Sequence, residues 1–178
     1  MTIIMKATEI KDLLTKVTGN TWKFSHIREK TWDVIRWLPI TSIGQGRWVG
    51  MSEDGYWVVE GKENEVIIIS ADNSLIFLLQ CLERPRAEFV ESLNKGLSNN
   101  NLSIVIAQNF PFDDLIACGL TFGNDYWAEL ALEWLKDQSL NKKIKDALTK
   151  LIKFKGASQK LRHKAQRILK SNDKGSVL

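Results

Sequence analysis

The pattern of apolar and polar positions predicts helices and a short strand in the first forty residues. Apolar side chains recur every three or four positions over Thr8 to Val17 and again over Ile27 to Leu38, which is typical of amphipathic helices. The second helix is expected to end at Pro39, because the residue before a proline disfavours helical backbone. Between the two helices, Trp22 and Phe24 alternate with polar neighbours, which indicates a short strand within residues 20–25.

Residues 47–70 carry the strongest strand signal of the chain. Three short runs are rich in β-branched and aromatic residues, and two segments of turn composition, 52–55 and 61–64, separate them. Consecutive short strands with tight turns predict an antiparallel meander. The uninterrupted apolar run at 66–69 predicts a third strand that is covered on both faces. The three strands expected are Trp48 to Met51, Tyr56 to Glu60, and Glu65 to Ser70.

The remainder of the chain is predicted to be mostly helical. Ser74 caps an expected helix that runs to Leu82, and Pro85 opens another that ends near Asn94. The stretch 102–107 fits a strand or the start of a helix equally well. Short links between the last helices predict antiparallel packing in a repeat-like stack. Those helices are Pro111 to Leu120, Asp125 to Lys136, Leu140 to Phe154, and Ser158 to Leu169.

These elements together predict an α+β fold, with an antiparallel β-meander, flanking helices and a C-terminal helical segment. We expect an α+β body over residues 1–108 and a helical segment over 109–178, which is basic from residue 136. The chain has 178 residues, 44% of them apolar, so it can bury a core without a metal or a disulfide. Cys81 and Cys118 lie in apolar runs and are expected to be reduced core residues. With no export signal and no apolar stretch of about 20 residues, we expect a cytoplasmic protein without a membrane span.

Charge is distributed unevenly along the sequence. Residues 1–135 contain 12 Lys and Arg against 18 Asp and Glu, a net charge of −6, whereas residues 136–178 contain 13 against 3, a net of +10. In one interpretation the basic helices pack against the acidic body and partly neutralise it. In the other they are free to bind an acidic protein, a nucleic acid or an anionic surface.

Few residues suggest catalysis. Asp125, Glu129 and Glu133 lie four apart and therefore on one face of a helix, where they could hold a metal or form an acid–base pair. A solvated face, or pairing with lysines of the next helix, explains the same spacing more simply. His26 and His163 have no partner in sequence, and no nucleophile elbow, phosphate-binding loop or Cys-x-x-Cys motif occurs. We therefore expect a protein that is not an enzyme and needs no metal or cofactor.

Several segments between residues 27 and 93 follow the order of a known family. They are a helix ending in Trp37-Leu38-Pro39, the strands 55–59 and 66–69, and a closing helix with Phe89-Val90-Glu91-Ser92-Leu93. In this order the chain resembles the SUKH superfamily, many of whose bacterial members are immunity proteins that bind and neutralise toxins. The resemblance implies a protein-binding role, and the helices after Pro111 have no counterpart in it.

We therefore expect a non-catalytic protein-binding module, of the immunity type that the resemblance implies, which binds a basic protein through its acidic body. Alternation places Trp48 and Trp57 at exposed or half-exposed strand positions, where tryptophan often forms interface hot spots. The partner-binding residues expected are Trp48, Glu53, Asp54, Tyr56, Trp57, Glu63 and Glu65. The alternative is a nucleic-acid-associated protein that contacts phosphates through its basic C-terminal helices. The residues expected for that role are Lys153, Lys160, Arg162, Lys164 and Arg167.

Overall fold

The structure, a computed structural model, describes residues 5–18, 22–28, 30–70, 73–136 and 138–174. The chain divides into two compact units. Unit 1 comprises residues 1–80 and 87–110, and unit 2 comprises residues 81–86 and 111–178. The sheet lies in unit 1 and the last four helices lie in unit 2, which confirms the α+β class with a C-terminal helical segment. The boundary falls close to the expected one, and the short segment 81–86 is an addition to the helical unit.

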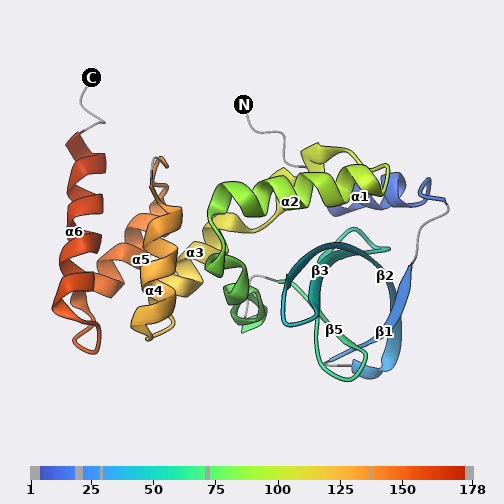
Figure 1. Cartoon of the computed structure of the whole chain (residues 1–178), viewed down its shortest axis with the longest axis horizontal. Coiled ribbons are helices and arrows are strands. Elements are labelled where there is room, and N and C mark those ends of the chain that lie inside the picture. Colours follow the sequence, from blue (N-terminus) through green and yellow to red (C-terminus); the bar gives the residue numbers. More distant parts are fainter. Residues whose placement is uncertain (1–4, 19–21, 29, 71–72, 137, 175–178) are drawn as a thin grey trace. The chain divides into compact units, whose positions relative to one another are not determined.

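Five strands in chain order form the sheet of unit 1 (Figure 1). Successive strands pair antiparallel, as the meander prediction required. The first and last strands also pair, in parallel, through His26 with Glu65 and Ile27 with Val66, and this closes the sheet into a barrel. This closure was not among the features predicted from the sequence, because it pairs strands that are distant along the chain. The strands are β1 (Lys23–Ile27), β2 (Lys30–Gly44), β3 (Arg47–Ser52), β4 (Trp57–Glu60) and β5 (Glu65–Ile68).

Strand β2 corrects the helix expected over Ile27 to Leu38. The spacing by three of Trp32, Ile35 and Leu38 suggested a helix, but the chain is extended over fifteen residues. Side chains alternate in this strand, so that Ile35 is buried in the barrel and Trp32 points to solvent. Pro39 does not end the strand. The pairing with β3 shifts register beside it, and proline is tolerated at such an irregularity although it has no N–H to donate to the ladder. The strand expected within residues 20–25 is β1, and positions 20 and 21 lie outside the described residues.

A small apolar core fills the barrel. Ile35, Trp37, Val58 and Val66 pack together there, with Ile27 and Ile68 at its margin. Trp37 is fully buried and supplies the largest side chain. In β5 the first two residues of the apolar run are buried and the third is half-buried, so the strand is largely covered on both faces, as expected.

Helices of unit 1 pack on the barrel at close range. These are α1 (Ala7–Leu14), α2 (Arg86–Asn99), which begins at the unit boundary, and the 3-10 helices η1 (Asn73–Glu83) and η2 (Ile104–Asn109). Helix α2 lies against β2, and a Cβ atom at Gly96 would stand 2.0 Å from the carbonyl oxygen of Ile40. η1 replaces the α-helix expected after Ser74, and η2 resolves the open choice at 102–107 in favour of a helix.

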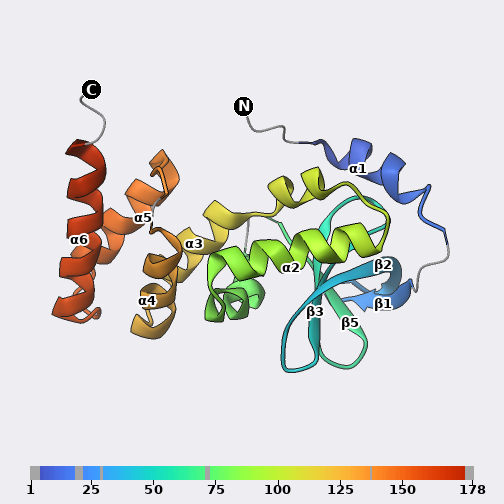
Figure 2. The same cartoon turned by 45° about the horizontal axis from the view of Figure 1, so that its top comes forward.

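Unit 2 consists mainly of two helical hairpins. Helix α3 packs on both α4 and α5, and α6 packs on α5 and α4, so the two hairpins stack as the repeat-like pattern predicted (Figure 2). Asparagine side chains cap two of the helices, Asn124 at α4 and Asn141 at α5. The four helices are α3 (Phe112–Thr121), α4 (Asp125–Trp134), α5 (Lys142–Lys153) and α6 (Gln159–Lys174). No helix among the described residues has the length and apolar character needed to cross a membrane.

Candidate binding surfaces

The outward side of the β1–β2 hairpin carries an unusual set of exposed side chains. The register pairs Phe24 with Arg36 and His26 with Val34, so these residues share one side of the hairpin. The alternation within β2 adds Trp32 to that side. We call this set, Phe24, His26, Trp32, Val34 and Arg36, the hairpin face.

Three apolar side chains of the hairpin face are largely exposed to solvent. The exposed fractions are 61% for Phe24, 95% for Trp32 and 57% for Val34. Isolated apolar residues at a surface are ordinary, but neighbouring ones on the same face mark interaction sites. Trp32 contributes almost no apolar burial to the fold, so the barrel does not explain a tryptophan at this position.

Charges of both signs surround the hairpin face, because the exposed Asp33 follows Trp32 in β2 and Glu53 lies beside Arg36. The Arg36 guanidinium lies 4.2 Å from the centroid of the Trp22 ring, within range of a cation–π interaction. Its Nε atom is also 3.7 Å from Oε2 of Glu53, a half-exposed pair that contributes little. Lys30 is exposed at the start of β2, next to the turn of the hairpin. The hairpin face itself contains no carboxylate and includes the cation Arg36, which favours an uncharged or acidic partner.

The hairpin face was missed because residues 27–38 were interpreted as a helix. A period of two was nevertheless present: the even positions from 22 to 36 are all aromatic, cationic, histidine or valine. A strand with one solvent-exposed face gives this alternation, although the exposed face is normally polar. The even positions are Trp22, Phe24, His26, Arg28, Lys30, Trp32, Val34 and Arg36.

The structure does not bring the expected partner-binding residues together. Glu53, Asp54 and Tyr56 belong to the β3–β4 turn, whereas Glu63 belongs to the β4–β5 turn and Glu65 begins β5. The two turns lie at opposite ends of β4, because β4 connects them. The residues therefore form two separate groups.

Several of the acidic residues in these turns already have cationic partners. Asp54 accepts a hydrogen bond of 2.7 Å from Lys11, and this bond, together with the attraction of the carboxylate, raises the pKa of Lys11. Glu65 accepts one of 3.0 Å from the Nε atom of Arg28. Such pairing leaves less negative charge available for a basic protein.

Trp57 corrects the expectation of an exposed or half-exposed tryptophan. It is only 6% exposed, and its ring meets that of Phe110 edge to face at 5.3 Å between centroids. Phe110 follows η2, so a distant segment covers the outer side of β4. Trp48 and Tyr56 are exposed, as an interface role would require.

The three carboxylates of α4 interact with α6 and the residue before it, whereas the pairing interpretation expected lysines of the next helix, α5. Lys164 lies between Glu129 and Glu133, with Nζ–Oε1 distances of 3.1 and 2.5 Å. The hydrogen bonds that Lys136 and Lys164 donate lower the pKa of Glu133. Asp125 accepts a hydrogen bond of 3.1 Å from the backbone N–H of Ser158, just before α6 begins. Within the described ranges, no group of three potential metal ligands occurs.

The expected nucleic-acid-binding residues have different environments. Lys164 is held by the two glutamates, and Arg162 is half-buried. Lys153, Lys160 and Arg167 are exposed. Only these three of the five are therefore open to an external polyanion.

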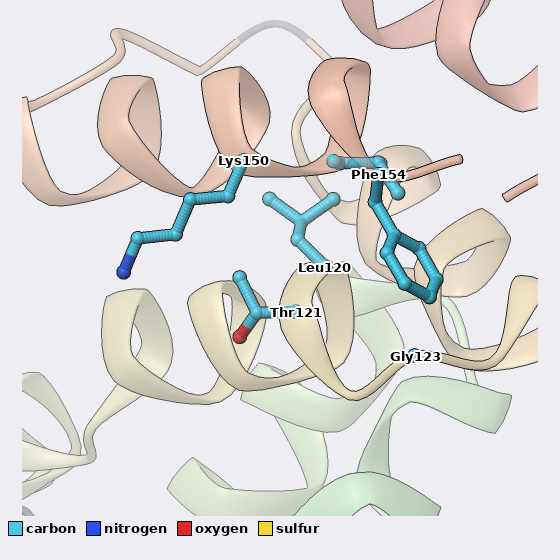
Figure 3. A pocket seen from close by; sticks show the side chains of 6 residues that line it. Leu120, Thr121, Gly123, Lys150 and Phe154 are labelled. Carbon is cyan, nitrogen blue, oxygen red and sulfur yellow. The ribbon is translucent and has the colours of Figure 1, made fainter. Parts of the chain in front are cut away.

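A shallow pocket of about 180 Å³ lies between α3 and α5 in unit 2 (Figure 3). Leu120, Leu151 and Phe154 supply apolar walls, and Lys150 and Thr121 supply the polar side chains. In Figure 3 the ammonium end of Lys150 extends away from the Phe154 ring. With one amine and one hydroxyl on opposite helices, the pocket lacks an acid–base pair or a nucleophile with its base.

Comparisons with protein-family models, with curated proteins and with solved structures found no match. The function is therefore argued from the surfaces of the two units.

Proposed function

We propose that this protein is a non-catalytic protein-binding module and that the hairpin face of its barrel is the docking surface. The observation that supports this proposal is the 95% exposure of Trp32, next to the exposed Phe24 and Val34 on the same face. Exposing these groups to water is unfavourable, and a partner that covers them recovers the hydrophobic free energy.

The composition of the hairpin face matches the anatomy of a protein interface. Tryptophan and arginine are the residue types most enriched in binding hot spots, and both are present here. The apolar centre is formed by Phe24, Trp32 and Val34, while Lys30 and Arg36 provide a polar rim. The pairing of Phe24 with Arg36 and of His26 with Val34 presents these side chains on a rigid support, so less entropy is lost on binding, while Trp32 lies where the register shifts.

The partner that fits is a protein with a pocket for an indole ring and an uncharged or acidic rim. The immunity-type role follows from the resemblance to the SUKH superfamily, since an inhibitor of that kind acts by covering a surface of its target. The acidic turns are a secondary candidate, because Asp54 and Glu65 are already paired with Lys11 and Arg28. A cytoplasmic location fits the two cysteines, which are both free thiols, because reducing compartments maintain that state.

The test compares the wild-type chain with Trp32→Ala and Phe24→Ala as immobilised bait in a lysate of the source cells, read by quantitative mass spectrometry. Tyr56→Ala is the matched control, since it removes an exposed aromatic ring that does not belong to the hairpin face. We expect one protein to be recovered near equal molar amounts by the wild type and by Tyr56→Ala. Its recovery should fall about tenfold or more with Trp32→Ala, as for a hot-spot residue.

Equal recovery by all four baits would remove the hairpin face from the interface. Light scattering on the same variants measures their molar mass and so tests whether a second copy of this chain binds the hairpin face. Dimerisation that Trp32→Ala abolishes would replace the foreign partner with self-association.

A further inference from the structure

Helix α6 presents a cationic stripe on the side opposite its buried residues. Lys160, Arg167 and Lys170 are separated by seven and three residues, so they lie on one side of the helix. All three are exposed, whereas Leu161 and Ala165 on the opposite side are buried. His163 lies in the same stripe and is also exposed.

The stripe has no carboxylate along most of its own helix, and Asp173 in the last turn is the first acidic residue of α6. Residues 159–172 contain neither Asp nor Glu. The carboxylates of the neighbouring helix α4 are used elsewhere: Glu129 and Glu133 bind Lys164, and Asp125 accepts from the backbone of Ser158. In α6, Lys164 is therefore used for contacts with α4, whereas the three cations of the stripe face solvent.

The spacing of the three cations fits a chain of phosphates. Ten residues separate Lys160 from Lys170, which corresponds to about 15 Å along a helix. Double-stranded DNA carries one negative charge for about every 1.7 Å of its axis, so several phosphates lie within reach of the stripe. The stripe contains no Phe, Tyr or Trp for stacking on bases, so we expect the contact not to read sequence.

We propose that the α6 stripe binds the phosphodiester backbone of a nucleic acid without sequence preference. Three exposed cations in a stretch without Asp or Glu, residues 159–172, are complementary to a phosphate chain, and binding would be driven by the release of counterions. This site is independent of the hairpin face, since it lies in unit 2 and uses no residue of the barrel.

The test measures fluorescence anisotropy of labelled duplex DNA, duplex RNA and single-stranded oligonucleotides of mixed sequence with the full chain. Three neutralised phosphates predict a slope of log K against log salt of about −2.7, which is roughly a fortyfold loss of affinity between about 50 and 200 mM salt. The triple variant Lys160→Gln, Arg167→Gln, Lys170→Gln should lose at least about tenfold in affinity at the lower salt, and most of the salt slope.

The matched control is the triple variant Lys16→Gln, Lys62→Gln, Lys95→Gln, which removes the same charge from exposed positions of unit 1. We expect it to bind as the wild type does, and Trp32→Ala should do so too. Equal losses in both triple variants would show a bulk charge effect and overturn the proposal. Salt-insensitive binding to the oligonucleotides, or no binding at the lower salt, would also overturn it. A parallel measurement uses phosphatidylserine vesicles, and binding to these vesicles alone would overturn it too. The DNA and RNA arms identify which backbone is preferred.

Discussion

The indole Nε1 of Trp37 donates a hydrogen bond of 3.0 Å to Oγ of Ser25, which connects β2 to β1 inside the barrel. The Ser25 hydroxyl in turn donates to Oδ1 of Asn64 at 3.1 Å. Asn64 has a left-handed backbone with φ of 62°, and its carbonyl accepts from the N–H of His26, beside the pair that closes the barrel. One buried serine thus links the largest core side chain to the turn where the sheet closes.

Replacing this serine should destabilise the protein more than its size suggests. Ser25→Ala leaves the buried indole N–H without an acceptor, which costs about 1–3 kcal/mol in the free energy of unfolding. Urea titration of the full chain measures the loss. Ser98→Ala, at an exposed position in α2, is the control and should change the value by less than about 0.5 kcal/mol. An equally small change in Ser25→Ala would show that water replaces the lost acceptor.

Two tryptophans in the same strand should contribute very differently to the free energy of unfolding. Trp37→Ala removes a fully buried ring and should cost about 3–5 kcal/mol in the free energy of unfolding. Trp32→Ala removes a ring that is almost fully exposed, so it should change that free energy by less than about 0.5 kcal/mol. The same urea titration compares the two variants. A large loss in Trp32→Ala would mean that this residue serves the fold rather than a partner.

Gly96 is required by the packing of α2 on β2. An alanine there would gain up to about 1 kcal/mol in helix propensity, but its Cβ would overlap the backbone carbonyl of Ile40. Since backbone atoms cannot rotate away, we expect Gly96→Ala to lower the free energy of unfolding by about 1–3 kcal/mol or more. Lys95→Ala, next to it and exposed, should be close to neutral. A stabilised Gly96→Ala would contradict the close approach.

The Glu133–Lys164 contact predicts a weak dependence of stability on pH. The pKa of Glu133 is lowered in the folded chain, so its stabilising contribution is present above the unfolded value of 4.5 and is lost as the pH falls through the folded value. The side chains are partly exposed, which limits this contribution to less than about 1 kcal/mol. Unfolding titrations between pH 7 and pH 3 should therefore show a smaller decline in Glu133→Gln than in the wild type. Parallel declines would show that the pair contributes nothing measurable.

Burial of Cys118 predicts slow thiol chemistry. Desolvation raises the pKa of its thiol, which lowers the fraction present as the reactive thiolate. At mildly alkaline pH the native chain should react with Ellman's reagent several times more slowly than the chain unfolded in guanidinium. The variant Cys81→Ala isolates the signal of Cys118, because the other thiol is then absent. A native rate equal to the unfolded rate would show that the thiol is accessible.

The helices of unit 2 could be predicted because their signals are local. Asn124 and Asn141 accept from backbone N–H groups at the helix starts, and the apolar stripes between them follow the helical period. The strands β3 to β5 could be predicted for the same reason, because short apolar runs and turn residues mark them locally. The spacing of the α4 carboxylates indicated that they share one face, but it placed their lysine partner on α5, whereas Lys164 belongs to α6.

The features that were missed depend on contacts between distant segments. Residues 30–38 match a period of three about as well as a period of two, and only the pairing with β1 and β3 selects the strand. The burial of Trp57 depends on Phe110, which follows more than fifty positions later. The hairpin face was hidden for the same reason, since a residue's outward direction is defined only once the strand is known.

The short segment 81–86 belongs to unit 2, although it is synthesised about 25 residues before the rest of that unit. The Leu82 side chain packs closely on Gly119 of α3, where a Cβ atom would lie 2.9 Å from Leu82 Cδ1. The Arg84 carbonyl accepts a hydrogen bond from the indole of Trp134, which follows it by 50 residues. Domains fold as units while the chain is being synthesised, the N-terminal one first. Unit 1 is complete once Phe110 has left the ribosome, whereas the partners of residues 81–86 in α3 and α4 follow later in the sequence. Nascent chains from which Phe110 but not Trp134 has emerged therefore lack the hydrogen bond between Arg84 and Trp134.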